Sequence, residues 1–346
     1  SLPKISNVLP GIEKRRYSLI SSGPKGGKTQ FTDFLYMYEP LEWLEKNPGT
    51  NVKLKIFYFS LEISKEAKLR AAISHRLFTE YGIIISPQKL LSVFNKYILG
   101  ENIIGIIKSP QFTSWLEWFE SIVDIQDTIR NPFGIFTTVR NFAEQNGSYV
   151  YKDIDWINED GSKTVKRVRD HYIPNDPDLF VLIIIDHISL LQTEKGQSLH
   201  QAITTFSSDY CLQMRDRWGF SPVVVQQQSA ASSDSEFTKN SGKIILEKVK
   251  PNPEGLADAK YTARDLDLMM SLFDPSKYDI SQYRGWDLDR LKGCHREFII
   301  NLNRDGISNA HCQLYFNGAT SYFKELPDVP SESVYKSIEN WETLTI

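Results

Sequence analysis

The fold of this chain is decided by the stretch Ser22-Gly23-Pro24-Lys25-Gly26-Gly27-Lys28-Thr29, together with the following Gln30. The stretch lies between a short β-prone run at 17–21 and residues 29–35, whose apolar side chains recur at helical spacing. A strand, a glycine-rich turn ending in Gly-Lys-Thr and a helix form the context of a phosphate-binding loop, or P-loop. Ser22 stands where the pattern G-x-x-x-x-G-K-[ST] has its first glycine, and serine is small enough to be tolerated there.

The roles of the loop residues follow from their chemistry. Glycines allow backbone N–H groups to converge on phosphate oxygens, and the helix that begins there adds the positive end of its dipole. We expect Lys28 to reach the β- and γ-phosphates of ATP and the Thr29 hydroxyl to ligate Mg²⁺. The alternative is a loop that satisfies the pattern by accident, so the rest of the chain has to decide.

Composition excludes several classes of protein. The 346 residues carry a net charge of −3, with both signs interspersed, so a nucleic-acid site must be local or must arise from subunits around a shared channel. Three widely spaced cysteines indicate a reducing compartment and no structural metal. No run approaches the roughly 18 apolar residues of a membrane span, and the start lacks a signal-peptide core. We therefore expect a cytoplasmic protein that does not enter a membrane.

The apolar runs are continuous rather than alternating, as expected for buried parallel strands. These expected strands are residues 55–60, 180–185 and 222–226, and helical stretches lie between them at 64–82, 110–122, 132–146 and 198–218. Strands that alternate with helices predict an α/β fold with a mostly parallel central sheet flanked by helices.

Three segments depart from this alternation. Residues 148–178 predict a β-hairpin insertion, because two β-prone runs flank a polar turn at 158–162. Residues 229–263 are polar and rich in serine and proline, which indicates a long mobile loop. We expect one ATPase domain over residues 1–326, followed by an acidic, proline-bearing tail or lid at 327–346.

Two carboxylates follow apolar strands. Asp186 closes the most apolar strand of the chain, where a Walker B aspartate holds Mg²⁺; the alternative is a loop or helix-capping aspartate. Glu62 follows the strand at 55–60, where a carboxylate is able to orient an attacking water. It equally fits a first-turn glutamate favoured by the helix dipole.

The order of these motifs resembles the ATPase domain of DnaB-type replicative helicases, which are RecA-like P-loop motors. The resemblance rests on the P-loop, Phe-Ser-Leu-Glu at 59–62, the strand ending in Asp186, Pro-Val-Val-Val-Gln-Gln-Gln at 222–228, and Asn-Arg-Asp-Gly at 303–306 with Phe-Asn-Gly at 316–318. It runs with gaps from about residue 10 to 325. Phe-Ser-Leu-Glu together with the Arg-Asp-Gly and Phe-Asn-Gly ending is not shared by P-loop proteins in general.

The resemblance implies a role for each matching residue. Glu62 is then the catalytic glutamate, and Asp186 is the Walker B aspartate. Gln228 would sense the γ-phosphate and lead into a DNA-contacting loop, although the neighbouring glutamines 226 and 227 leave the register open. Arg304 would be the arginine finger that reaches the nucleotide of the adjacent subunit. Without the resemblance, Arg304 is an ordinary arginine in a β-turn.

Some features differ from the resembled pattern. Leu302 stands where the family usually carries a lysine two residues before the finger. His187 follows Asp186 where the family has an aromatic residue, and we expect a packed histidine there rather than a metal ligand. The insertion at 148–178 is longer than the family needs. Together these features indicate a divergent member of phage or mobile-element type.

Two segments are candidates for contact with nucleic acid. The basic strand at 163–169, with tyrosine and tryptophan opposite, fits phosphate contact and base stacking, and equally fits a solvated hairpin edge. The loop after Gln228 is the better candidate by its position in the resembled fold. Its charge would come from four lysines: Lys239, Lys243, Lys248 and Lys250.

We therefore expect an ATPase that hydrolyses ATP with Mg²⁺ and moves along or remodels single-stranded DNA as a homo-oligomeric ring or filament. The resemblance implies a hexameric ring, with a primase or loader as a further partner. Two alternatives stay open: a recombinase-like or mediator ATPase that does not unwind DNA, and a nucleotide-gated assembly protein. Glu62 together with Arg304 favours the motors, because a scaffold needs neither a water-positioning carboxylate nor a finger in trans.

Overall fold

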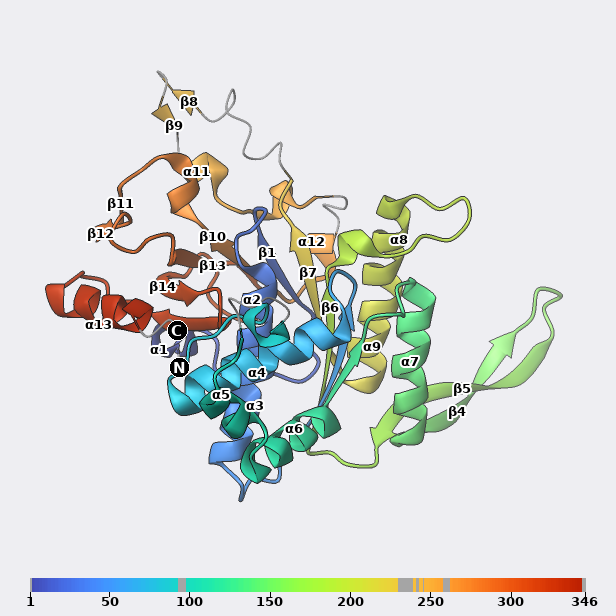
Figure 1. Ribbon diagram of the computed structural model, residues 1–346. Coiled ribbons are helices and arrows are strands. Elements are labelled where there is room, and N and C mark those ends of the chain that lie inside the picture. Colours follow the sequence, from blue (N-terminus) through green and yellow to red (C-terminus); the bar gives the residue numbers. More distant parts are fainter. Residues whose placement is uncertain are drawn as a thin grey trace.

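The computed structural model describes residues 2–92, 98–229, 239–240, 243–244, 246–257 and 262–343. A nine-stranded sheet with the order β15-β14-β13-β10-β1-β7-β6-β2-β3 forms its centre (Figure 1). The strands from β10 to β3 run parallel to one another, and β13, β14 and β15 extend the sheet in antiparallel fashion. The expected mostly parallel sheet is confirmed. The strand bounds are β1 Ser18–Ser22, β2 Lys53–Ser60, β3 Val123–Gln126, β6 Leu179–Asp186, β7 Ser221–Gln227, β10 Leu268–Phe273, β13 His295–Asn303, β14 His311–Asn317 and β15 Tyr322–Glu325.

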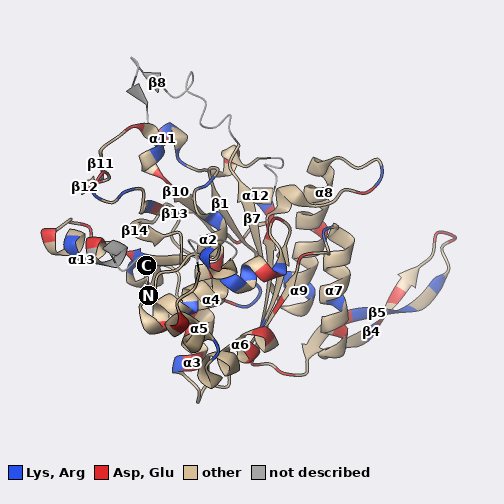
Figure 2. Cartoon of the chain, in the orientation of Figure 1, with Lys and Arg blue, Asp and Glu red and all other residues tan. Residues whose placement is uncertain are grey.

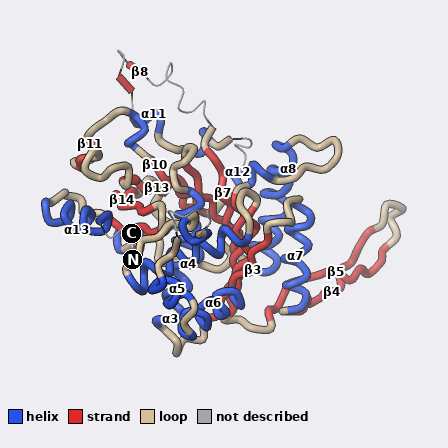
Figure 3. The backbone as a smooth tube through the Cα atoms, in the orientation of Figure 1, coloured by secondary structure: helices blue, strands red, loops and turns tan. Residues whose placement is uncertain are grey.

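Helices cover both faces of this sheet (Figure 3). One helical segment runs without interruption from Lys28 to Lys46 through α2, η1 (Phe34–Tyr38) and α3. The stretches expected to be helical correspond to α4, α6, α7 and the α8–α9 pair. The bounds are α2 Lys28–Asp33, α3 Glu39–Lys46, α4 Lys65–Tyr81, α5 Glu101–Ile107, α6 Pro110–Ile122, α7 Pro132–Gln145, α8 Leu199–Thr205, α9 Leu212–Trp218, α11 Leu246–Val249 and α12 Thr262–Asp265.

The core has two layers because successive strand side chains point to opposite faces of the sheet. Ile20, Tyr58 and Ile184 face one layer, where they pack with aromatic side chains of α2 and α6. Their neighbours Leu19 and Ile183 face the other layer, which α7, α8 and α9 cover. A strand buried on both faces reads as continuously apolar, and this is why the apolar runs located the sheet.

A long hairpin projects away from this body (Figure 1). It consists of β4 (Gly147–Ile157) and β5 (Lys163–Pro174), paired antiparallel, and confirms the expected insertion. The Tyr172 hydroxyl, which donates to the Ala143 carbonyl oxygen at 2.9 Å, anchors its base. Farther out, the Lys166 ammonium lies over the Trp156 ring. Residues of both charge signs occur along the hairpin (Figure 2). Contact with nucleic acid and a solvated edge both remain predictions for this hairpin.

The N-terminal residues of the described chain contact the segment around the end of β15. Helix α1 (Pro3–Ser6) contacts the end of β15, where the Lys4 backbone N–H donates to Glu325 Oε2 at 2.8 Å. The segment expected to be a tail or lid forms α13 (Glu332–Thr343), whose Tyr335 and Ile338 are buried against Trp286. Within the described ranges, no helix has the length and apolar character that a membrane crossing requires.

Candidate nucleotide-binding site

The P-loop leaves the buried end of β1 and turns directly into α2. Gly27 has φ +95°, which glycine adopts at little cost, and the first turn of the helix closes when the Phe31 N–H donates to the Gly27 carbonyl oxygen at 2.8 Å. A Cβ on Gly26 would lie 2.7 Å from Ser22 Oγ. Serine therefore fits at the first position of the motif because the facing residue is a glycine. The Ser22 hydroxyl donates to the Gly23 carbonyl oxygen at 2.9 Å.

The structure brings Thr29 and Asp186 together behind this loop. Thr29 Oγ1 donates to Asp186 Oδ1 at 3.0 Å, although 157 residues separate the two in sequence. Asp186 ends β6 and is 1% exposed. A hydroxyl and a carboxylate at this distance match the donor set that holds Mg²⁺ beside nucleotide phosphates. This pair is therefore the candidate metal position. No cluster of three or more His, Cys, Asp or Glu side chains suited to a metal occurs in the described parts of the chain.

A buried polar network that sequence reasoning missed supports Asp186. Tyr58 donates to Asp186 Oδ2 at 3.0 Å and also lies 2.7 Å from Asp33 Oδ1. The Lys68 ammonium, completely buried, lies 2.9 Å from both Asp33 oxygens and 3.5 Å from Asp186 Oδ2. Burial raises the pKa of Asp33, and the Lys68 charge opposes that shift. A charged residue at 33, in the middle of an apolar helical stretch, was the signal available in the sequence.

Glu62 lies beside Asp186 at the same edge of the sheet. The register of β2 and β6 pairs Ser60 with Asp186, and Glu62 follows two residues later. Its side chain is 50% exposed, and its Oε2 lies 3.7 Å from His187 Nε2. A half-exposed carboxylate next to the metal position is free to meet a water molecule. Its catalytic role remains a prediction, and so does the choice between that role and a helix-start residue.

Gln228 occupies a more enclosed position than expected of a phosphate sensor. Its backbone N–H donates to the carbonyl oxygen of Ser22, the first residue of the P-loop, at 3.0 Å. Its side-chain amide donates to Ser21 Oγ at 3.0 Å and to the Asn252 carbonyl oxygen at 3.1 Å. In the β1–β7 register, Ser22 pairs with Gln227, so this preceding glutamine shares the face of Ser22. Gln227 is therefore a second candidate for the sensor role.

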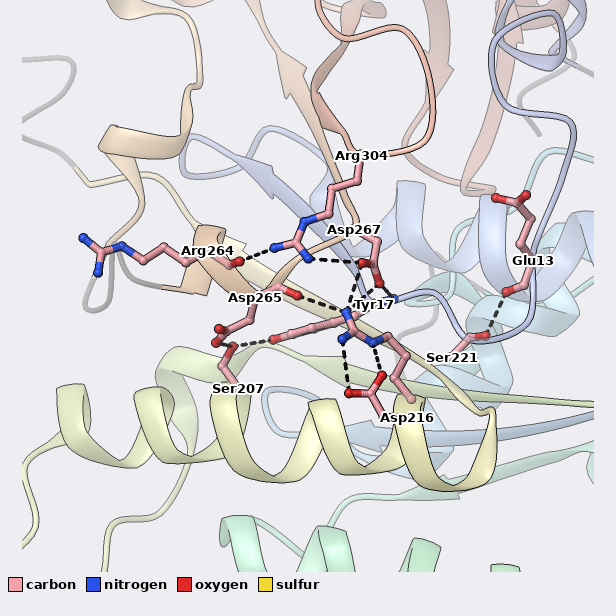
Figure 4. Close-up of polar contacts among 10 residues, drawn as sticks. Glu13, Tyr17, Ser207, Asp216, Ser221, Arg264, Asp265, Asp267 and Arg304 are labelled. Atoms are coloured by element: carbon pink, nitrogen blue, oxygen red, sulfur yellow. Dashed lines mark hydrogen bonds and ion pairs between the residues drawn. The ribbon is translucent and has the colours of Figure 1, made fainter. Parts of the chain in front are cut away.

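Arg304 lies at the edge of the sheet formed by the opposite ends of the strands, away from the P-loop. Strand β13 runs antiparallel to β10 and pairs Asn303 with Leu268, which in turn pairs with Ser18 at the start of β1. The P-loop leaves the other end of β1, roughly 15 Å away at the usual rise per residue. The Arg304 side chain is 46% exposed, and its guanidinium lies 3.7 Å from Asp267 Oδ1 and donates to the Arg264 carbonyl oxygen (Figure 4). Arg304 therefore cannot serve the P-loop of its own chain.

Two cations that sequence reasoning missed contact the P-loop itself. Arg296, from β13, donates from Nε to the Gly26 carbonyl oxygen at 2.9 Å. Lys277, from the short helix η8 (Pro275–Tyr278), donates to the Pro24 carbonyl oxygen. Arg296 lies 270 residues from Gly26 in the sequence, and Lys277 lies 253 residues from Pro24. No local sequence motif predicts these contacts.

The four lysines expected to contact DNA lie in different surroundings. Lys239 belongs to β8 (Lys239–Asn240) and Lys243 to β9 (Lys243–Ile244), whereas the surrounding residues 230–238, 241–242, 245 and 258–261 lie outside the described residues. Lys248 is exposed. Lys250 is largely enclosed, and its ammonium lies 2.7 Å from Glu247 and 3.4 Å from the buried Glu297. Lys248 is therefore the better placed of the last two for an external ligand.

A groove of about 640 Å³ lies apart from the site, between α3, β2 and α6. Trp115, Trp118 and Arg76 contribute to its wall, and none of the predicted site residues does. It therefore adds nothing to the nucleotide site.

Comparison with known proteins supports the fold described above. No family model matches the sequence, and no curated protein is similar to it in sequence. Among solved structures, the ATPase domain of G40P is 17% identical, with 94% of this chain and 90% of that chain covered and a TM-score of 0.61. This chain shares the fold of that ATPase domain.

A second solved structure agrees. It is a DnaB-like replicative helicase, described together with its interactions with primase, and it is 16% identical with a TM-score of 0.63. The match covers 94% of this chain and 62% of that one, so this chain spans less than two thirds of that helicase. The resemblance inferred from the motifs is thus confirmed for the fold. At these sequence identities, the comparison does not transfer the activity or the partners of those proteins to this chain.

Proposed function

We propose that this chain is the ATP-hydrolysing domain of an oligomeric motor that acts on single-stranded DNA, as DnaB-like helicases do. The observation that carries the proposal is the 3.0 Å contact between Thr29 Oγ1 and Asp186 Oδ1 at the root of the P-loop. Two solved structures with this fold are an ATPase domain and a DnaB-like replicative helicase. A cytoplasmic location belongs to this proposal.

The donor set fits Mg²⁺ with ATP. Thr29 and Asp186 would hold the ion, and Mg²⁺ supplies charge neutralisation on the β- and γ-phosphates. Because Tyr58 occupies Oδ2 of Asp186, Oδ1 is the oxygen aimed at Thr29 and the loop. Lys28 binds the phosphates from the start of α2, and Glu62 orients the attacking water from its half-exposed position.

The position of Arg304 supports an oligomer. It lies at the sheet edge opposite its own P-loop, so its guanidinium is able to stabilise a γ-phosphate only in a neighbouring subunit. A ring in which each subunit presents its P-loop edge to the Arg304 edge of the next satisfies this requirement with one repeated interface. A hexamer and a primase or loader partner belong to this proposal.

The segment after β7 is the proposed contact to single-stranded DNA. It begins at Gln228, next to the P-loop strand, and it contains the exposed Lys248. Neutralising Lys239, Lys243, Lys248 and Lys250 together should weaken binding to single-stranded DNA and flatten its salt dependence, because fewer counterions are released. Lys248 alone should account for a larger share of the loss than Lys250. An unchanged salt slope would direct attention to the β4–β5 hairpin.

The deciding experiment measures the ATPase rate with and without single-stranded DNA, together with the native mass. We expect hydrolysis that needs Mg²⁺, rises with DNA and accompanies an oligomer, and we expect Lys28→Ala to lose it. DNA stimulation without strand separation would instead indicate a recombinase-like ATPase. Nucleotide-dependent assembly without hydrolysis would indicate a scaffold and would overturn the motor.

A further inference from the structure

Four cationic side chains gather around the P-loop. Lys25 and Lys28 belong to the loop and the helix that follows it, whereas Lys277 and Arg296 arrive from η8 and β13. Among the described ion pairs, Lys277 and Arg296 share one carboxylate, that of Asp274. It lies 3.3 Å from Arg296 and 4.0 Å from Lys277. Positive charge therefore exceeds negative charge in this group, which is the arrangement that a polyanionic ligand completes.

Arg296 has a structural task that occupies most of its donors. Its side chain is 6% exposed, and it donates to the carbonyl oxygens of Gly26 and Gly293 while it pairs with Asp274. Its guanidinium also stacks over the Phe316 ring, whose edge lies 3.2 Å from the place where a Cβ on Gly27 would be. These contacts fix the backbone of the loop from behind.

Lys277 differs from Arg296 in each of these respects. Its side chain is 39% exposed, and its ammonium donates to the neutral Pro24 carbonyl oxygen. Its carboxylate neighbour Asp274 lies closer to Arg296 than to Lys277. Partial burial lowers the pKa of Lys277, Asp274 opposes this shift, and the positive charges of Arg296, Lys25 and Lys28 lower it further. A phosphate brought among these groups would relieve that repulsion.

We propose that Lys277 is a phosphate-contacting residue of the nucleotide site, supplied in cis from η8. Its ammonium exchanges the Pro24 carbonyl for the phosphate oxygens when a nucleoside polyphosphate binds. This proposal rests on the nucleotide site of the proposed function and deepens it. In addition to Lys28, the site then receives a second cation from its own chain, Lys277, and one cation from the neighbouring chain, Arg304. The alternative is that Lys277 only clamps the loop.

The test measures equilibrium affinity for AMP, ADP and ATP with Mg²⁺, by calorimetry on the full chain. Lys277→Met removes the charge and keeps most of the side-chain volume, and Lys277→Arg keeps the charge. Lys46→Met is the matched control, because Lys46 is an exposed lysine at the far end of the continuous helix, paired with Glu42. We expect Lys277→Met to raise the ATP dissociation constant about tenfold, the usual scale of one charge-assisted contact.

The dependence on phosphate number separates a ligand contact from a loop clamp. A phosphate contact predicts a loss that is large for ATP, smaller for ADP and negligible for AMP, with Lys277→Arg close to the parent. An equal loss for all three nucleotides, or none for ATP, would overturn the proposal. If the parent chain binds no nucleotide, the proposed function itself fails. If the parent and Lys46→Met bind, Lys28→Ala does not, and Lys277→Met matches the parent, the inference about Lys277 alone fails.

Discussion

The two ends of strand β1 differ in how the nearby cationic side chains are paired. At the P-loop end, Lys277 and Arg296 donate to backbone carbonyl oxygens of the loop. At the other end, Arg304 lies 3.7 Å from Asp267 (Figure 4). Arg215 also pairs with Asp267, at 3.0 Å. At the P-loop end, cations therefore outnumber the carboxylates that pair with them. At the other end, the cations pair with carboxylates of the same chain. The arrangement at the P-loop end suits an anion-binding site. The arrangement at the Arg304 end suits an edge that docks against a neighbouring subunit.

The largest expected effect tests whether the Arg304 edge completes the P-loop edge of a neighbour. Arg304→Ala should lower the ATPase rate of the assembled protein by about 10³-fold or more, since a finger in trans contributes on the order of 10³ to 10⁵. The rate per subunit of the parent should rise with protein concentration as subunits associate.

Mixing variants gives the sharpest version of this test. Arg304→Ala subunits have an intact P-loop, and Lys28→Ala subunits have an intact finger, so a mixture should regain part of the activity through composite sites. Normal turnover by Arg304→Ala, or a rate independent of protein concentration, would contradict the finger in trans. The comparison between the two edges would then lose its functional meaning.

The next effect concerns the chemistry at the P-loop edge alone. Glu62→Gln should bind ATP as tightly as the parent and hydrolyse it about 10²- to 10⁴-fold more slowly, because a residue that orients the water acts in the transition state. Lys28→Ala should lose binding and hydrolysis together. Single-turnover rates and nucleotide affinities measured side by side provide the check. Parental turnover by Glu62→Gln would make Glu62 a helix-start residue.

A smaller effect, on folding, tests the buried charges behind Asp186. Lys68→Met leaves Asp33 and Asp186 buried without a cation, so the free energy of unfolding should fall by about 3 to 5 kcal/mol. The double variant Asp33→Leu/Lys68→Met replaces the pair by apolar side chains and should recover most of the loss. Urea unfolding followed by circular dichroism measures both. A single variant as stable as the parent would show that solvent reaches this network.

The sequence allowed some of this architecture to be predicted, for identifiable physical reasons. Strands buried on both faces read as apolar runs, and the P-loop is contiguous, so the sheet and the positions of Thr29 and Asp186 followed from local patterns. Lys277 and Arg296 act through single contacts to a loop more than 250 residues away. No spacing rule connects such residues. The partner of Arg304 in its own chain, Asp267, was hidden for the same reason.

The smallest expected effect concerns β13, the strand that connects the two edges. His295, beside Arg296 at its start, is 0% exposed, and burial lowers its pKa from 6.5 to about 4, with Gln313 opposing the shift and Arg296 adding to it. Because the unfolded chain binds the proton first, stability is fully present above about pH 6.5 and is lost as pH falls toward 4. The loss between pH 7 and pH 5 should be about 2 kcal/mol. His295→Phe, which keeps a ring against Tyr283, should remove that part of the pH dependence in urea unfolding at pH 7, 6 and 5. If the variant and the parent lost stability equally, other groups would carry the acid sensitivity, and β13 would connect the two edges without a titrating group of its own.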